Sequence, residues 1–150
     1  MTDQKTVTTS TGAGKNVADM LVTTMAEVFC TLQVEGIHCW PECPFDEVAY
    51  LRDPHRHLFH VKAHKFVTHS DRDVEFIMMK HRIEAFLLTE YGQEVDSTVW
   101  SISNHKRVCL FGAMSCEMIA DQLCTQFDLH KCEVSEDGEN GAIVHRKRNY

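Results

Sequence analysis

The chain has 150 residues, of which 43% are hydrophobic and 25% charged, and its formal net charge is −7 with histidine neutral. This length and composition predict one globular domain, and the negative charge argues against a nucleic-acid-binding protein, which needs a basic surface. No apolar run reaches the ~18 residues of a membrane span. The chain has seven cysteines, without the spacing of a disulfide scaffold and without a signal segment. We therefore expect reduced thiols in a cytoplasmic protein.

The beginning of the chain divides into a tail and the start of the domain. Residues 1–16 are polar and rich in Thr and Gly, and we expect them to form a disordered tail. The domain is then expected over residues 17–150. Residues 17–28 fit either a short helix or the approach to a strand. From Val28 to His38 apolar and polar residues alternate, which predicts a strand with one buried face.

A second strand is predicted after a long connection. Residues 39–54 hold all three prolines of the chain, which is typical of irregular backbone. In residues 55–67 the odd-numbered positions, apart from Lys65, are apolar after two histidines, His55 and His57. This face is expected to pack inward, with the histidine pair at its end. The other histidines of this stretch are predicted to be surface or turn residues: His60, His64 and His69.

Two helices are predicted in the second half of the chain. The first is expected over residues 73–91, after a turn at residues 69–71 that offers capping side chains. The second is expected to begin at the capping residue Ser115. Extended pieces are predicted within residues 96–111, 131–136 and 141–145, the last two joined by a turn with Gly and Asn. The order β-β-α-α-β-β predicts an α+β fold with two helices on one face of an antiparallel sheet.

The histidine pair His55 and His57 is the pattern that points most directly to chemistry. Side chains at i and i+2 of a strand project from the same face, so both imidazoles are expected to reach one metal ion. His38 ends the preceding strand and is the predicted third ligand. Three imidazoles with an open fourth position are typical of catalytic zinc, so Zn²⁺ is the predicted cofactor. A competing site of His38 with Cys39 and Cys43, or a plain histidine-rich strand, stays open.

Five short segments occur in a suggestive order along the chain: VEGIH, HRHLFHVKA, DVEFIMMK, MSCEM and CEVSED. They resemble, distantly and over roughly residues 31–144, the motifs of the 6-pyruvoyltetrahydropterin and 6-carboxytetrahydropterin synthase family, which has the tunnelling fold or T-fold. VEGIH is similar to the strand that ends in the family's first zinc histidine, and HRH stands in place of H-G-H. The other three are similar to the starts of the two helices and to a strand ending in a pterin-binding Glu.

The resemblance implies roles for the residues of the last two segments. The family's Glu accepts two N–H groups from the pterin edge, and Glu136 stands in that position. Backbone groups around Ser115 and Cys116 would hold the rest of the edge, while zinc would act as a Lewis acid on side-chain oxygens of the substrate. Read without the resemblance, Glu136 is a solvated turn residue. Glu117 fits a capping carboxylate at least as well as a ligand.

The proton-transfer groups of the family have no counterpart in the same place. The family has a cysteine shortly before H-G-H and an Asp–His pair after the long helix. The nearest counterparts here are Cys43, in the proline-rich connection, and His105, which follows Asn104 rather than an Asp. Cys43 and His105 are therefore the predicted catalytic residues, and Cys43 is a structural thiol in the alternative interpretation.

The function implied by the resemblance is a zinc-dependent synthase or lyase. Its substrate would be a dihydropterin such as dihydroneopterin triphosphate, and its product would feed tetrahydropterin or 7-deazaguanine synthesis. The family assembles into rings with sites between subunits, and unpaired sheet edges give a physical reason for such a homo-oligomer. Neither nucleic acid nor membrane is an expected partner. The alternatives are a non-catalytic protein that binds a pterin, purine or related nucleotide, and a structural ring without a ligand.

Overall fold

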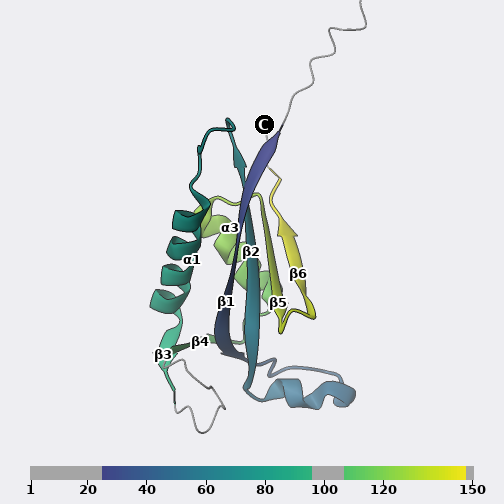
Figure 1. Cartoon of the computed structure of the whole chain (residues 1–150). Coiled ribbons are helices and arrows are strands. Elements are labelled where there is room, and N and C mark those ends of the chain that lie inside the picture. The colour runs from purple at the N-terminus through teal and green to yellow at the C-terminus, as the bar shows by residue number, and fades with distance from the viewer. Residues whose placement is uncertain (1–24, 96–106, 148–150) are drawn as a thin grey trace, which may run out of the picture.

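The computed structural model describes residues 25–95 and 107–147 of the chain. The tail expected at residues 1–16, the undecided segment up to residue 24 and the extended pieces expected within residues 96–106 lie outside the described residues. The described parts form a mixed α+β unit in which one sheet carries helices (Figure 1). No helix in these parts is both long and apolar enough to cross a membrane.

Two long strands begin the unit, with a 3₁₀ helix between them: β1 (Ala26–His38), η2 (Asp46–Arg52) and β2 (His55–Val67). The later elements are α1 (Phe76–Glu90), β3 (Gly92–Glu94), β4 (Arg107–Gly112), α3 (Cys116–Phe127), β5 (Lys131–Glu136) and β6 (Asn140–His145). Within the described residues six strands form one sheet, in the order β3-β4-β1-β2-β5-β6. The predicted α+β class is confirmed, and β3 and η2 are elements that the sequence pattern does not predict.

The sheet is antiparallel except at one pair of strands. β1 pairs with β2, β2 with β5 and β5 with β6 in antiparallel registers, whereas β1 and β4 are parallel. The expectation of a wholly antiparallel sheet is therefore wrong at this pair. The physical reason is the additional strand β3, which reverses the chain once more before β4. β4 runs antiparallel to β3 and therefore in the same direction as β1.

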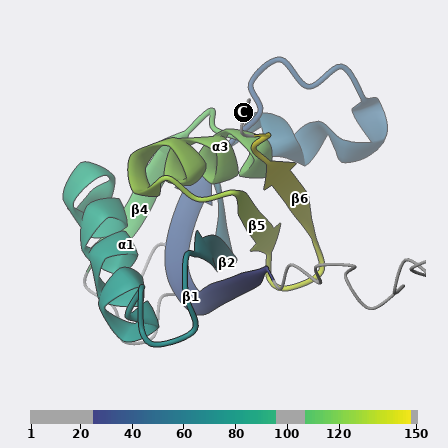
Figure 2. The same ribbon diagram turned by 90° about the horizontal axis from the view of Figure 1, so that it is seen from above.

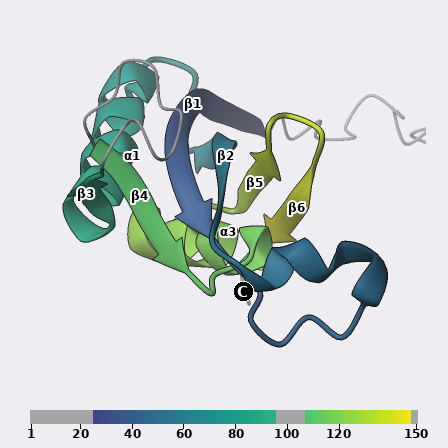
Figure 3. The same cartoon turned by 90° about the horizontal axis from the view of Figure 1, so that it is seen from below.

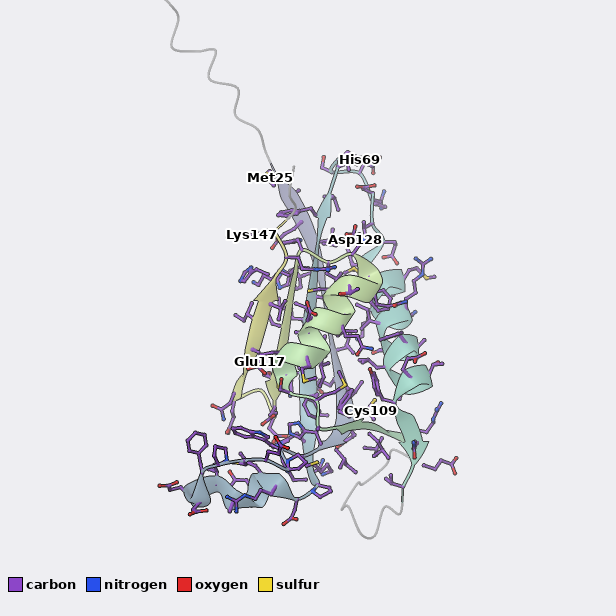
Figure 4. All side chains as sticks on the ribbon, turned by 180° about the vertical axis from the view of Figure 1, so that it is seen from behind. Met25, His69, Cys109, Glu117, Asp128 and Lys147 are labelled. Carbon is purple, nitrogen blue, oxygen red and sulfur yellow. The ribbon has the colours of Figure 1, made fainter. Side chains whose placement is uncertain are left out.

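Both α-helices cover the same face of the sheet, as Figures 2 and 4 show from two directions. The odd-numbered positions of β2 face them, and Phe59, Val61 and Ala63 are buried as predicted. The helices contribute stripes of apolar residues at helical spacing, which are Met79, Ile83 and Leu87 from α1 and Cys116, Ile119 and Leu123 from α3. Two other apolar residues of these helices, Phe76 and Met118, are exposed. Phe76 lies in the first turn of α1, and Met118 lies one position off the stripe of α3.

The helix starts are fixed by side chains that accept hydrogen bonds from free backbone N–H groups. Ser115 caps α3 as predicted, and its hydroxyl accepts from the N–H of Met118. α1 begins later than expected, at Phe76, because the carboxylate of Glu75 caps it by accepting from the N–H groups of Ile77 and Met78. The cap fixes the residue at which α3 begins, and so the position of its first turn relative to the sheet.

His64 differs from its expected place on an open surface. It lies on the sheet face opposite the helices, yet only 4% of it is exposed. Its Nδ1 is 3.2 Å from Glu27 Oε1, and its Nε2 is 2.8 Å from Glu133 Oε1. Burial opposes ionisation of Glu27, but hydrogen bonds from His130 and His64 outweigh it and lower the pKa of this carboxyl. The prediction that His64 is a surface residue is wrong, because carboxylates from both neighbouring strands contact its ring and cover it.

The proline-rich connection projects from the end of the sheet where β1 finishes and β2 begins, as Figures 1 and 3 show. It contains the 3₁₀ helix η2 and is pinned to itself by two contacts. The N–H of Trp40 donates to the carbonyl of Leu51 at 2.6 Å, and Arg52 Nε donates to the carbonyl of Cys43 at 2.9 Å. The connection is therefore an ordered projection next to the strand ends that carry the histidines.

Candidate metal centre

Three histidine side chains meet where β1 ends and β2 begins. The antiparallel register pairs His38 directly with His55 and Gly36 with His57, so all three side chains emerge on the helix-covered face. One ring nitrogen from each lies within 4.8 Å of the others. Among the described residues this is the one set of three or more His, Cys, Asp or Glu side chains so placed. The predicted association of His38 with the histidine pair is confirmed, and this cluster could hold a metal ion.

Each ring is held in orientation through its Nδ1 atom. His38 Nδ1 lies 3.0 Å from the carbonyl oxygen of Met114, and His55 Nδ1 lies 2.8 Å from that of Asp53. His57 Nδ1 lies 2.6 Å from Oδ2 of Asp137. All three partners are hydrogen-bond acceptors, so each Nδ1 donates its proton, and in a neutral ring Nε2 is then the nitrogen with a lone pair. This is the outer-shell arrangement that fixes the ring tautomer of metal-binding histidines.

The Nε2 atoms of all three rings are buried without a hydrogen-bond partner. A buried polar atom without a partner costs free energy, and native proteins avoid it unless something else satisfies it. A cation bound among the three rings could satisfy these atoms together. Imidazole is a common ligand of zinc, copper, iron and nickel, so the donor set fits a transition metal without distinguishing among them.

Asp137 is a part of this centre that sequence reasoning missed. Its Oδ2 contacts His57, and its Oδ1 accepts from the backbone N–H of Leu58 at 2.9 Å. The hydrogen bond with His57 lowers the pKa of Asp137 despite some burial. Asp137 and Gly138 both have positive φ, 54° and 74°, which turns the chain tightly after β5. The acidic run SEDGEN indicates only a turn, because nothing in it shows that β5 lies beside β2.

Replacing Asp137 with Asn is expected to weaken metal binding by roughly 10–100-fold, the effect typical of losing an outer-shell carboxylate. The amide keeps the size of the side chain but removes the charge that stabilises the ligand ring. Competition with a chromophoric chelator measures the affinity. Glu139→Gln is the matched control, since it removes a carboxylate from the same turn without touching a histidine. Equal affinities for both variants and the unchanged protein would contradict the role of Asp137.

A cavity of about 540 Å³ opens beside the histidines. His38 and His55 line it from the sheet, Trp40 and Leu51 from the projecting connection, and residues 113–118 from the start of α3. The first turn of α3, where Figure 4 labels Glu117, points toward this end of the molecule. Two carboxylates, of Glu117 and Glu136, belong to the lining. The predicted pterin-contact residues Ser115, Cys116 and Glu136 therefore lie together in one cavity with two of the three histidines.

Glu136 lies closer to the histidines than its predicted role requires. One carboxylate oxygen is 3.2 Å from His38 Nε2 and the other is 3.5 Å from His57 Nε2, as close imidazole–carboxylate contacts. The adjacent His38 ring lowers the pKa of Glu136, although burial acts in the opposite direction. At His38, burial favours the neutral ring, but Glu136 and the carbonyl of Met114 outweigh it and raise the pKa. The carboxylate is therefore ionised at neutral pH and adds negative charge where a cation would bind.

Cys43, one of the two predicted proton-transfer residues, is not brought into this group of side chains. Cys43 is buried in the projecting connection, with Sγ directed at the carbonyls of Phe45 and Val48, and it does not line the cavity. It also does not join His38 and Cys39 in a metal-sized cluster. His105 lies outside the described residues. The thiol that does reach the cavity is Cys116, whose Sγ is 3.7 Å from Glu136 Oε1.

Comparison with known proteins assigns no family. No family model matches the chain, and no curated protein matches it significantly.

The thiol of Cys116 is in the wrong protonation state for a strong base. Burial, together with the nearby charges of Glu136 and Glu117, raises its pKa to about 12. At neutral pH it keeps its proton and donates toward Glu136. Cys116 therefore orients the carboxylate rather than abstracting a proton. All seven cysteines of the chain are free thiols.

Proposed function

We propose that this protein is a T-fold pterin-binding protein that uses zinc to act on a dihydropterin, as a synthase or lyase of the 6-pyruvoyl- or 6-carboxytetrahydropterin type. The observation that carries the proposal is the convergence of three imidazoles beside a cavity lined by Glu136, Ser115 and Cys116. The motif order along the sequence supports the pterin class, and the metal-binding cluster supports the reaction type.

The cavity has the chemistry that a flat, polar heterocycle needs. Backbone N–H groups in the first turn of α3 are free of helical partners, and carboxylates accept adjacent N–H groups as a charge-assisted pair. Trp40 at the rim offers a flat apolar surface. When bound, zinc would supply Lewis acidity toward oxygens of the substrate side chain. His38, His55 and His57 would hold the metal, and Asp137 would keep the ring of His57 in place.

A ring of subunits is part of the proposal. The six-stranded sheet with two helices on one face is compatible with the T-fold, and its edge strands β3 and β6 each leave one row of backbone groups unpaired by the sheet. Joining edges between copies would satisfy these groups and remove a site of uncontrolled aggregation. Cys43 and His105 stay predicted catalytic residues of such an assembly.

A second candidate is a non-catalytic protein that binds a pterin, purine or related nucleotide at the same cavity. The specific observation in its favour concerns the thiols. Cys43 faces loop carbonyls instead of the cavity, and the raised pKa of Cys116 makes that thiol a poor base. A protein with metal and ring contacts but without a base would bind the ligand and release it unchanged.

Incubating the full-length, zinc-loaded protein with dihydroneopterin triphosphate tests the proposal. We expect release of triphosphate and formation of a new pterin, separated by liquid chromatography, and we expect both to stop when a chelator removes the metal. Tight pterin binding without turnover would support the non-catalytic alternative. Absence of pterin binding by equilibrium dialysis would contradict the first candidate, and absence of purine and nucleotide binding as well would contradict the second.

A further inference from the structure

We infer that Glu136 is a fourth protein ligand of the metal held by His38, His55 and His57, and that ligand binding in the cavity releases it. The first half of this inference depends only on the metal centre. The second half rests on the proposed function, because it needs a ligand that enters the cavity. A carboxylate on the metal is a different role from the pterin-edge contact that the sequence resemblance implies for Glu136.

Two contacts of Glu136 have the length expected between neighbouring ligands on one metal ion. Zinc holds imidazole nitrogens at about 2.0–2.1 Å and carboxylate oxygens at about 2.0–2.2 Å in tetrahedral sites. Two donors on such a tetrahedron are then separated by about 3.3–3.5 Å. The two oxygens of Glu136 lie 3.2 Å from His38 Nε2 and 3.5 Å from His57 Nε2. A shared cation would give a physical reason for one carboxylate to approach two imidazoles at once.

The fold delivers this carboxylate to the histidines through strand pairing. Glu136 is the last residue of β5 and is paired with Phe59 of β2, two positions after His57 on the same face. The next residue, Asp137, holds the opposite side of the His57 ring at Nδ1. Glu136 would thus bind the metal directly, and the next residue, Asp137, would accept the hydrogen bond from the metal ligand His57. Cys116 donates toward Glu136 Oε1, which further limits where the carboxylate can point.

A metal-bound Glu136 cannot at the same time hold the far edge of a bicyclic ring. The side-chain oxygens of a pterin and its amino-bearing edge lie at opposite ends of the molecule, whereas Glu136 lies directly against two of the metal's histidines. Entry of such a ligand would therefore require the carboxylate to leave the metal. Once released, Glu136 becomes a free, oriented acceptor within the cavity. Three histidines would remain, the arrangement of a zinc site with an open position.

Cobalt substitution tests the ligand role without relying on activity. Metal-free full-length protein is titrated with Co²⁺, whose visible absorption is strong in four-coordinate sites and weak in six-coordinate ones, and Zn²⁺ affinity is measured by chelator competition. We expect the visible Co²⁺ band of E136Q and Glu136→Ala to differ from that of the wild-type protein, because another donor replaces the carboxylate. Their Zn²⁺ affinity should fall at least roughly tenfold, the lower end of the loss seen for outer-shell partners. E117Q is the matched control and should leave both readouts unchanged, since it alters a carboxylate of the same cavity.

The outcomes separate the two halves of the inference. Wild-type spectra and affinities for both Glu136 variants, with folding verified by circular dichroism, would overturn the ligand role; if the Ala variant does not fold, E136Q decides. For the release step, dihydroneopterin triphosphate is added to the Co²⁺-loaded wild-type protein, and we expect its visible band to change. A ligand that binds without changing the band would overturn release. If no pterin binds while E136Q still alters the Co²⁺ band, the ligand role stands and the proposed function fails.

Discussion

Replacing His57 with Ala is expected to abolish stoichiometric metal binding. The variant loses one of three convergent ring nitrogens and leaves Asp137 without the ring that it orients. Loss of a direct ligand should cost at least roughly 100-fold in affinity, the upper end of what outer-shell changes cost. Elemental analysis of protein purified in the presence of Zn²⁺ measures the effect. We expect about one metal per chain before the change and close to none after it.

His60→Ala provides the matched control for this experiment. His60 lies on the same strand three residues further on, and its Nδ1 contacts Gln33 Nε2 at 3.2 Å on the opposite face of the sheet. Its replacement removes an imidazole of β2 without touching the cluster, so metal content should be unchanged. Equal metal content in the His57 variant and the control would end the assignment of the cluster as a metal centre.

Replacing Phe59 with Ala is expected to lower the free energy of unfolding by about 3–5 kcal/mol, the typical cost of removing a buried Phe side chain. Phe59 has no exposed surface, and its ring packs edge-on against Phe111 at 5.0 Å between centroids. Native domains are stable by only about 5–15 kcal/mol, so this change removes a large part of the total. Urea unfolding followed by circular dichroism measures it.

The same substitution should also weaken the metal centre. The Phe59 ring lies against the rings of His38 and His57, at 5.2 Å and 5.9 Å between centroids, and a cavity there would let both histidines move. Phe76→Ala is the control, because 51% of Phe76 is exposed at the start of α1, and we expect a change of about 1 kcal/mol or less. A Phe59 variant as stable as this control would contradict the placement of Phe59 in the core.

The periodicity of the sequence predicts the two central strands well because both are long and have one buried face. Alternation of apolar and polar residues places His38 at the end of one strand and His55 at the start of the other, and in the structure β1 ends and β2 begins at these residues. The inward odd face of β2 follows from the same signal. Period alone does not distinguish the buried His64 from an exposed residue, since its burial comes from Glu27 and Glu133 on neighbouring strands.

The sequence by itself determined which side chains could form a metal centre. Side chains two residues apart on a strand must share a face, and a strand that precedes a reversal of the chain must end near its partner. Only the tertiary structure decided what surrounds them. The pairing of β5 with β2 brings Glu136 and Asp137 to the histidines, and α3 brings Cys116. These contacts join residues about 80 or 20 positions apart through strand order and helix placement, which local periodicity does not encode.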